Sequence, residues 1–306
     1  MYYFIINPRS RSGYGAVIWD KIQHELESRG IPYEAYFTLY KKHAARLAHE
    51  LEDRHHTCTI VVVGGDGTVN EVLNGLTHPA RITLGYIPTG SGNDFARGMG
   101  IPFDPAEALS LILSSHAVAE MDIGTLKTRY HTRCFGVSAG IGFDAAICHE
   151  ALASPIKDTL NHLGLGKLTY VGIALRQLFL FKPCQARICL DKKQTLHFPR
   201  LYFAAAMNQK YEGGGFQFAP GAKSDDGKLH ICVVGNLSKP KILLMLPTAF
   251  WGKHIHLKGI HMFSCRQIDI HTDRPLPVHS DGESCGYADS ISLSTASEQI
   301  SVITPG

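Results

Sequence analysis

Short apolar runs alternate with helical patterns along about the first 120 residues of the chain. Runs rich in β-branched and aromatic residues predict four strands, at 2–6, 33–38, 59–63 and 82–87. Between them, apolar residues recur at helical spacing within 17–26, 44–51 and 69–76, and Asp104-Pro105-Ala106-Glu107 is typical of a helix start. Strands that alternate with helices predict a mostly parallel sheet with helices on both faces.

From about residue 122 the pattern changes to short strand-like runs separated by turn residues. These runs lie at 131–138, 185–190, 196–206, 228–234, 261–263, 267–271 and 290–294, with helical stretches within 142–181 and 240–253. The sequence therefore predicts two domains, an α/β domain over residues 1–122 and a β-rich domain over 123–306. A last apolar run at 300–303 predicts a strand that belongs to either domain.

Composition and charge exclude several classes of protein. A hydrophobic fraction of 44% in 306 residues is enough to fill a core in each domain, and a net charge of +3 is far from that of a nucleic-acid binder. The apolar runs are shorter than the roughly 20 residues that cross a bilayer. Eight cysteines occur singly, without metal-binding spacing, and are expected to be reduced. We therefore expect a cytoplasmic protein without a transmembrane segment or a nucleic-acid partner.

The segment Gly64-Gly65-Asp66-Gly67-Thr68 joins a buried strand to a helical pattern. Its glycines leave the backbone amides open to a phosphate, and the start of the following helix adds partial positive charge. A carboxylate such as that of Asp66 repels a bare phosphate, so its presence implies Mg²⁺ between the two. The segment therefore predicts a phosphoryl-transfer site.

Two further loops follow strands that are predicted to end at the same edge of the sheet. Asn7 to Gly13 follows the first strand, and Pro88 to Ala96 follows the fourth. Ligands of parallel α/β sheets bind at the carboxyl ends of the strands, so we expect the three loops to line one nucleotide site. Arg9 or Arg11 is then placed to meet a phosphate. Asp94 either caps the helix that it begins or lies near the metal-bound phosphates.

These motifs and several later ones occur in the order found in a known family. The later ones are Val137-Ser138-Ala139-Gly140-Ile141-Gly142-Phe143-Asp144, Gly213-Gly214-Gly215, Pro220-Gly221-Ala222, Asp225-Asp226-Gly227-Lys228-Leu229 and Asp281-Gly282-Glu283. They occur together with Asn7-Pro8, GGDGTVNEV (residues 64–72) and PTGSGNDFA (residues 88–96). The whole set resembles the diacylglycerol kinase catalytic domain of bacterial lipid kinases, which is shared with sphingosine and ceramide kinases. The resemblance implies an NAD kinase/diacylglycerol kinase-like α/β domain with a mostly parallel sheet, a C-terminal β-sandwich and an active site between them.

The resemblance also implies roles for individual residues. ATP with Mg²⁺ is expected to contact Asn7, Thr38, Gly64, Gly65, Asp66, Gly67, Thr68, Val69, Asn70, Ser91, Asn93 and Asp94. A structural Mg²⁺ is expected on the Asp226 carboxylate and the backbone carbonyls of Lys223 and Lys228. Asp66 is expected to act in catalysis, and Asp281 and Glu283 are both candidates for the general base. The chain departs from the common Leu-Gly-Thr-Ala-Asn by having Thr89-Gly90-Ser91-Gly92-Asn93, which adds a glycine to the loop.

The expected function is an ATP-dependent lipid kinase that acts on diacylglycerol or a related neutral lipid at the membrane surface. The product is then a phospholipid such as phosphatidic acid, and the enzyme is peripheral at the inner membrane surface. Two alternatives are a soluble-substrate kinase of the NAD kinase type and a catalytically silent lipid- or nucleotide-binding protein. The sequence leaves a homo-oligomer open. It also favours core packing over contact with an anionic bilayer for the apolar and lysine-rich stretch 239–258.

Overall fold

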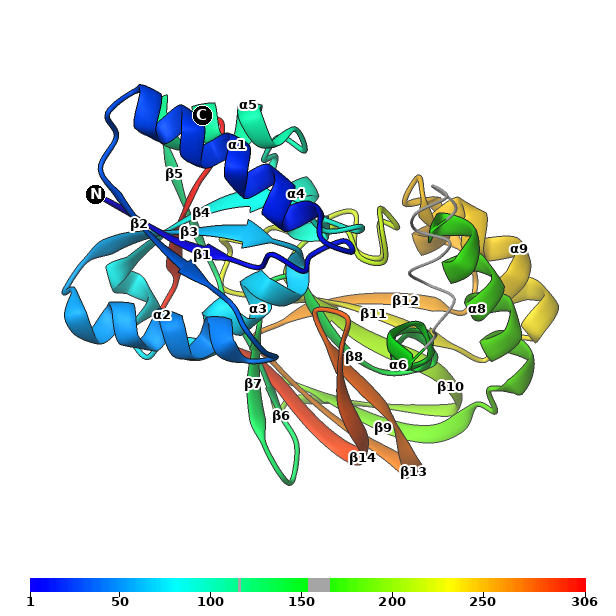
Figure 1. The fold of residues 1–306 in the computed structure, drawn as a ribbon. Helices are drawn as coiled ribbons and strands as arrows, with labels where there is room; N and C mark the ends of the chain where they lie inside the picture. Colours follow the sequence, from blue (N-terminus) through cyan, green and yellow to red (C-terminus); the bar gives the residue numbers. More distant parts are fainter. Residues whose placement is uncertain (115–116, 154–165) are drawn as a thin grey trace. The chain divides into compact units, whose positions relative to one another are not determined.

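A computed structural model describes residues 1–114, 117–153 and 166–306, which form two compact units (Figure 1). The first unit comprises residues 1–123 and 297–306, and the second comprises residues 124–296. The strand at the end of the chain, which the sequence left unassigned, therefore belongs to the first unit. Among the described residues, no helix combines the length and the apolar character that crossing a membrane requires.

The first unit is built on a six-stranded sheet in the order β2-β1-β3-β4-β15-β5. All neighbours pair in parallel except β15 and β5. The strands are β1 (Tyr2–Ile6), β2 (Tyr33–Phe37), β3 (Cys58–Gly64), β4 (Ile82–Pro88), β5 (Val118–Met121) and β15 (Ile300–Ile303). The predicted mostly parallel α/β domain is confirmed.

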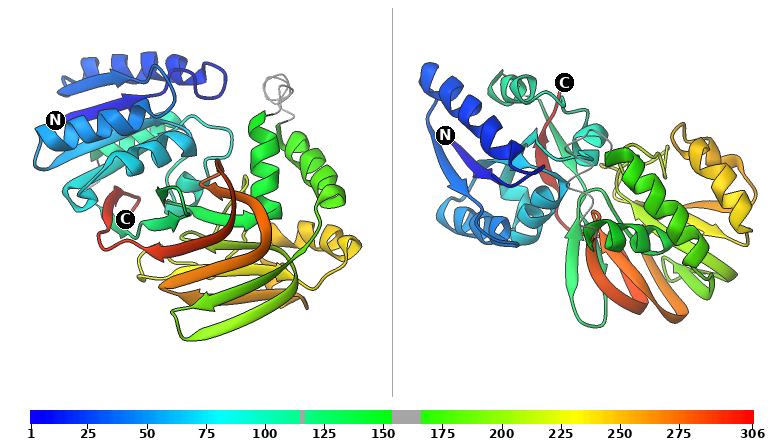
Figure 2. Two further views of the ribbon diagram at one scale, coloured as in Figure 1. Left: turned by 90° about the horizontal axis from the view of Figure 1, so that it is seen from below. Right: turned by 45° about the vertical axis from the view of Figure 1, so that its right-hand side comes forward.

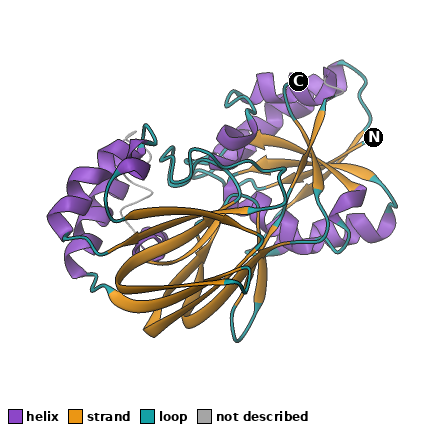
Figure 3. Ribbon diagram, turned by 180° about the vertical axis from the view of Figure 1, so that it is seen from behind, coloured by secondary structure: helices purple, strands orange, loops and turns teal. Residues whose placement is uncertain are grey.

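Helices cover both faces of this sheet (Figure 3). They are α1 (Tyr14–Ser28), α2 (His43–Arg54), α3 (Asp66–Gly75), the 3-10 helix η1 (Pro79–Arg81), α4 (Asp94–Met99) and α5 (Pro105–Ser114). α1 and α5 contact each other on one face, and α2 and α3 contact each other on the other face. Buried between the layers, Phe4, Ile5 and Ile6 are fully inaccessible to solvent, as expected for a strand with neighbours on both sides.

The strand register aligns the loops that carry the predicted motifs. Ile6 pairs with Phe37 on one side and with Val63 on the other, and Gly64 pairs with Pro88. Parallel strands in register end together, so the residues that follow β1, β2, β3 and β4 emerge at one edge of the sheet. This edge carries the candidate nucleotide site.

The second unit contains nine strands among its described residues and is a β-sandwich, as predicted (Figure 2). Its strands are β6 (Gly124–Lys127), β7 (Thr132–Phe135), β8 (Ser138–Gly142), β9 (Cys184–Leu190), β10 (Gln194–Met207), β11 (Leu229–Gly235), β12 (Ile260–Cys265), β13 (Gln267–Ser280) and β14 (Glu283–Thr295). The long strands β10 and β13 each pair with β9 over their first part and with β8 over their last part. Register shifts in both strands mark the change of partner.

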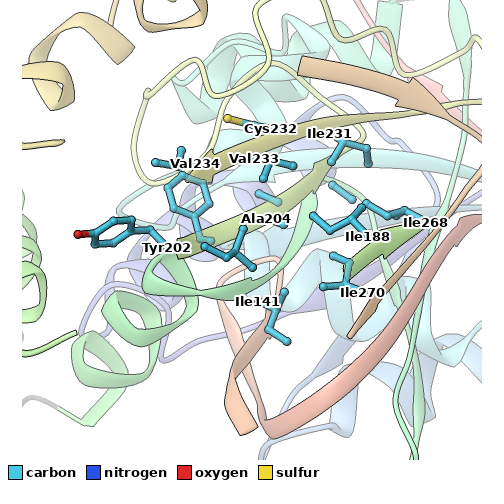
Figure 4. Close-up of a cluster of buried hydrophobic side chains, with 14 of the residues drawn as sticks. Ile141, Ile188, Tyr202, Ala204, Ile231, Cys232, Val233, Val234, Ile268 and Ile270 are labelled. Atoms are coloured by element: carbon cyan, nitrogen blue, oxygen red, sulfur yellow. The ribbon is translucent and has the colours of Figure 1, made fainter. Parts of the chain in front are cut away.

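The described helices of the second unit are α6 (Phe143–Ala153), α8 (Gly166–Leu180), α9 (Lys239–Ala249) and the 3-10 helix η2 (Lys253–His256). α6 packs on β8, β10, β13 and β14. The core of the unit is formed by fully buried aliphatic side chains of several strands, among them Ile141, Ile188, Ala204, Ile231 and Ile270 (Figure 4). This core holds β8 and β13, and the Asp281-Gly282-Glu283 segment, called the DGE motif below, follows the end of β13.

The structure corrects one predicted strand. Residues 131–138 form the two strands β7 and β8 rather than one, separated by Gly136 and Val137. The backbone amides of Gly136, Val137 and Ser138 turn away from a strand ladder and donate to the side chain of Asp281. The run appears continuous in the sequence because the residue that breaks it lies more than 140 positions away.

Candidate active site

The glycine turn between β3 and α3 leaves no room for side chains. A Cβ atom on Gly64 would lie 2.6 Å from Oγ1 of Thr68, which is itself only 5% exposed. The side-chain amide of Asn7 donates to the same Thr68 oxygen at 3.1 Å. The structure therefore brings Asn7, Gly64 and Thr68 together, with the start of α3 at Asp66.

The loop after β4 is tied to this turn by backbone and side-chain contacts. The amide of Thr89 donates to the carbonyl of Gly64 at 2.7 Å, and the hydroxyl of Thr89 bonds that of Ser10 at 2.6 Å. A Cβ atom on Gly90 would lie 2.8 Å from Cα of Gly65, so the two loops pass each other backbone to backbone. Hydrogen bonds thus join the three loops at the carboxyl ends of β1, β3 and β4.

Two carboxylates approach each other within this group of loops. Asp66 accepts the amide hydrogens of Asp94 at 3.1 Å and of Phe95 at 3.0 Å. A Cβ atom on Gly92 would lie 3.3 Å from Oδ2 of Asp66 and 3.7 Å from Oδ2 of Asp94. Burial and the charges of these two carboxylates raise the pKa of Tyr86 well above its usual value. Two aspartates beside an amide-lined turn are a donor set that suits Mg²⁺.

The other predicted nucleotide residues occupy different environments around the three loops. Thr38 is half-buried and its amide donates to Ile6, while Ser91 is exposed. Asn93 has a left-handed φ of 52° and its side chain donates to the carbonyl of Gly90. Val69 and Asn70, by contrast, lie on the buried side of α3.

Gly67 is the second residue of α3 and is half-buried. Arg9 and Arg11 are both exposed. Glu71, for which the sequence indicated no role, accepts the amides of Lys42 at 2.8 Å and Ala44 at 3.2 Å and so caps α2. The residues around Glu71 in the sequence give no signal of this contact, because α2 and Glu71 are separated by the whole of β3.

In the second unit, Asp281 lies in the two-residue turn between β13 and β14. Both turn residues have positive φ, 47° for Asp281 and 76° for Gly282, as a tight hairpin requires. The Asp281 carboxylate accepts three backbone hydrogen bonds of 2.8 to 2.9 Å, from Gly136, Val137 and Ser138. Glu283, the first residue of β14, is half-buried. The two acids of the DGE motif therefore have different surroundings.

A buried histidine lies two residues before this turn. Nε2 of His279 is 3.2 Å from a carboxylate oxygen of Asp144 and 3.3 Å from one of Glu212, and the histidine is fully buried. Its Nδ1 is 3.4 Å from the amide nitrogen of Gly282. Burial by itself lowers the pKa of His279, but Glu212 and Asp144 together with Asp281 raise it to about 9. Sγ of Cys148 lies within 4.8 Å of side-chain ligand atoms of Glu212 and His279.

The sequence indicated no role for His279 or Glu212. Asp144 was part of a quoted motif, but also without a role. The sequence shows only that a histidine precedes an acidic turn. This pattern cannot identify Glu212 and Asp144 as partners of His279, because they lie 67 and 135 positions away. The chain fold, not local pattern, assembles this group.

The predicted metal-binding residues in the Asp225-Asp226-Gly227 turn also come together. Asp226 accepts the amide of Lys228 at 3.0 Å, and its other oxygen lies 3.2 Å from Nε2 of His230. The amide nitrogen of Lys223 is 3.4 Å from the same histidine atom. His230, which the sequence analysis did not single out, thus links Lys223 to Asp226. One carboxylate with nearby backbone carbonyls is a ligand set that Mg²⁺ accepts.

Comparison with known proteins gives matches over most of the chain. Residues 1–126 match the diacylglycerol kinase catalytic domain, and residues 138–303 match the YegS C-terminal NAD kinase beta sandwich-like domain. The chain is 30% identical to "Putative lipid kinase YtlR" of Bacillus subtilis, over 93% of this chain and 94% of that protein.

Two solved structures are similar to the fold. One is the crystal structure of "a putative diacylglycerol kinase" from Bacillus anthracis, with a TM-score of 0.78, 25% identity, and coverage of 99% of this chain and 95% of that one. The other is an NAD kinase from Archaeoglobus fulgidus in complex with ATP, with a TM-score of 0.55, 13% identity, and coverage of 99% and 94%. At that identity the second match shows the fold alone.

Proposed function

The chain belongs to the diacylglycerol kinase-like family of bacterial lipid kinases, and we propose that it transfers the γ-phosphate of ATP to the hydroxyl of diacylglycerol, giving phosphatidic acid. The observation that supports this most is the assembly of three small-residue loops around Asp66 at one edge of the first sheet. Loops of this kind hold polyphosphates in unrelated folds, because amides without side chains approach the phosphate oxygens closely.

In this proposal the first unit holds the nucleotide. The amides of Gly65 and Gly67, the start of α3 and the side chains of Asn7 and Thr68 would bind phosphate oxygens. Thr38 and Ser91 would contact the rest of the nucleotide. Asp66 and Asp94 would hold Mg²⁺, which, when bound, neutralises charge on the transferring phosphate. Asp66 has a second task that needs no metal, because it fixes the start of α4.

For the general base, the surroundings favour Glu283 over Asp281. Asp281 already accepts three backbone amide hydrogens, so its carboxylate oxygens are engaged in holding the segment between β7 and β8. Glu283 lies two residues later, as the first residue of β14, and is half-buried. A base must take a proton from the lipid hydroxyl as the bond to phosphorus forms. We therefore assign this step to Glu283 and the support of the turn to Asp281.

The Asp226 turn is proposed to hold a second, structural Mg²⁺. Asp226 would supply a carboxylate oxygen, and Lys223 and Lys228 would supply backbone carbonyls. A test that does not depend on activity is thermal unfolding with and without Mg²⁺, compared between the native protein and Asp226→Asn. Equal stabilisation of both proteins by Mg²⁺ would reject this site.

The function is tested with purified protein, labelled ATP, Mg²⁺ and diacylglycerol in detergent micelles, with NAD as a soluble acceptor in parallel. We expect label in phosphatidic acid. Label on NAD alone would support an NAD kinase-type enzyme, and no transfer to any extracted lipid would support a silent binding protein. Mass spectrometry of extracted lipids after the reaction identifies the acceptor if it is a different neutral lipid.

A further inference from the structure

Helix α9 of the second unit is apolar on two opposite sides. Ile242 and Ala249, seven residues apart, are buried against the core of the unit. Leu244 and Trp251 have the same spacing, but they are 76% and 68% exposed. Leu244 lies on the side of α9 opposite Ile242, and Trp251 lies just beyond the helix end at Ala249, so an exposed apolar stripe runs along α9 and into the turn that follows it. The sequence favoured core packing for the stretch 239–258; the structure buries Ile242 and Ala249 but leaves Leu244 and Trp251 exposed.

The stripe continues onto the end of α8. Phe179 and Leu180 are 68% and 59% exposed, and the ammonium group of Lys239 at the start of α9 donates to the carbonyl of Phe179. The two helices lie side by side in each view of the ribbon (Figures 1 and 2). We call Phe179, Leu180, Leu243, Leu244 and Trp251 together the α8–α9 apolar surface.

The segment that carries α9 and η2 has charges of one sign. Between Asp226 and Asp269 the sequence contains no acidic residue, although it contains five lysines and Arg266. Four of these lysines, Lys239, Lys241, Lys253 and Lys258, lie in or next to α9 and η2, and all but Lys239 are exposed. The whole chain has a net charge of only +3, so this segment is strongly basic relative to the rest.

We propose that the α8–α9 apolar surface docks on a bilayer that contains anionic phospholipids. Exposed leucine and aromatic side chains flanked by lysines are the composition of interfacial helices, in which apolar groups enter the acyl boundary and lysines pair with headgroup phosphates. A second copy of the chain would carry the same lysines, so two such surfaces would repel each other electrostatically. The charge therefore favours a membrane over self-association.

This docking would give the enzyme access to a lipid acceptor in the bilayer, and that interpretation rests on the proposed kinase function. Binding is measured without ATP, so failure of the kinase assay and failure of docking are separate results. A protein that binds vesicles but transfers no phosphate would leave the docking surface intact. A protein that phosphorylates lipid in detergent but ignores vesicles would overturn only the docking.

Trp251 provides a direct probe, because the chain has only two tryptophans. Trp19 is 3% exposed and packs against Phe4 in the first unit, whereas Trp251 is 68% exposed. Phosphatidylcholine vesicles that contain phosphatidylglycerol should shift the emission of the native protein to shorter wavelength. Lipids brominated along the acyl chain should quench it. Vesicles of phosphatidylcholine alone should shift the emission much less. Emission that is unchanged by both kinds of vesicle would overturn the proposal.

Substitutions in the α8–α9 apolar surface test whether this surface binds the vesicles. We expect Leu244→Glu combined with Trp251→Glu to weaken sedimentation with anionic vesicles at least about tenfold, since each change removes apolar insertion and adds like charge. The matched control is Tyr130→Glu: Tyr130 is 81% exposed and lies in the turn before β7, at the opposite end of the strand order from β12. The control should bind as the native protein does.

Two outcomes of these measurements would contradict the proposal. One is vesicle binding that is unchanged in the double variant. The other is a native dimer in light scattering that the double variant dissociates, without any vesicle binding, which would assign the surface to a second copy. Circular dichroism and phosphorylation of short-chain diacylglycerol in detergent show whether the variants are folded.

Discussion

The carboxylate of Asp66, in the first turn of α3, accepts the backbone N–H of Asp94, the first residue of α4. The side chain of Asp66 thus caps α4, the helix that follows the loop after β4. This places the negative charge of Asp66 near the carboxylate of Asp94. The same residue therefore connects the fold to the proposed chemistry. Substitutions that separate these two tasks are the sharpest test of the site.

Asp66→Asn and Asp66→Ala should differ in stability but not in activity. Asparagine keeps an oxygen that can accept an amide hydrogen, whereas alanine leaves the amides of Asp94 and Phe95 without this acceptor. Loss of such a cap costs about 0.5–2 kcal/mol of unfolding free energy. Both variants lose the negative charge that would hold Mg²⁺, so we expect both to lose nearly all turnover. Denaturant unfolding and the kinase assay check this, and near-normal activity in either variant would refute the assigned role.

Gly90→Ala should weaken ATP binding by pushing two loops apart. The added methyl group would lie 2.8 Å from Cα of Gly65 and 2.7 Å from the side-chain oxygen of Asn93. We expect the dissociation constant for ATP to rise at least about tenfold, because a displaced amide no longer reaches its phosphate. Gly172→Ala is the control: nothing lies within 4 Å of its added Cβ, and alanine favours the helix α8. Calorimetric titration of both variants with ATP decides the question, and equal affinities would contradict it.

Glu283→Gln and Asp281→Asn should show opposite effects. Without a base at 283, we expect kcat to fall about 10²- to 10⁴-fold at little cost in stability. Asparagine at 281 tolerates the left-handed turn, yet it replaces a charged acceptor of three amide bonds, each worth roughly 1.5–3 kcal/mol with a charged partner. We therefore expect Asp281→Asn to be destabilised by at least about 2 kcal/mol. If Asp281→Asn instead unfolds like the native protein while losing all activity, the two roles are reversed.

Stability should fall as the pH rises because of His279. Burial lowers the pKa of His279, but the carboxylates of Glu212, Asp144 and Asp281 raise it from an ordinary 6.5 to about 9. Cys148 also lies near His279 and Glu212. A raised pKa means that the contribution to folding is complete below about pH 6.5 and is lost as the pH rises through about 9. The free energy of unfolding of the native protein should therefore decrease over this interval. His279→Gln should show a flatter pH profile, and parallel profiles would show that the histidine is not responsible.

Local pattern was enough to predict the elements that carry the nucleotide loops. β1, β3 and β4 are rich in β-branched and aromatic residues and end at or just before asparagine, glycine or proline, which is typical of strands buried in a parallel sheet. The short β5 was not predicted, because its four residues form a strand only by pairing with β15, which lies about 180 residues later. The long β13 and β14 were predicted only in part, since polar residues alternate along their exposed sides.

The same limit holds for the candidate site. Glycines mark the turn at Gly64 and the hairpin at Gly282 in the sequence: a Cβ on Gly64 would meet Thr68, and Gly282 has a φ of 76°. The partners of a carboxylate are set by the fold. Nothing near Asp281 indicates that it binds the amides between β7 and β8, and nothing near Glu71 indicates that it caps α2. Roles that depend on distant contacts required the structure.

The return of β15 to the first sheet has a consequence for biosynthesis. This strand lies between β4 and β5, so the nucleotide domain is a split domain whose interior strand is translated last. During translation, the nascent sheet has an open edge at β4 until the entire β-sandwich has left the ribosome. A ribosome stalled within residues 124–296 therefore carries an unfinished nucleotide domain, and chaperones that shield β edges are expected to bind there.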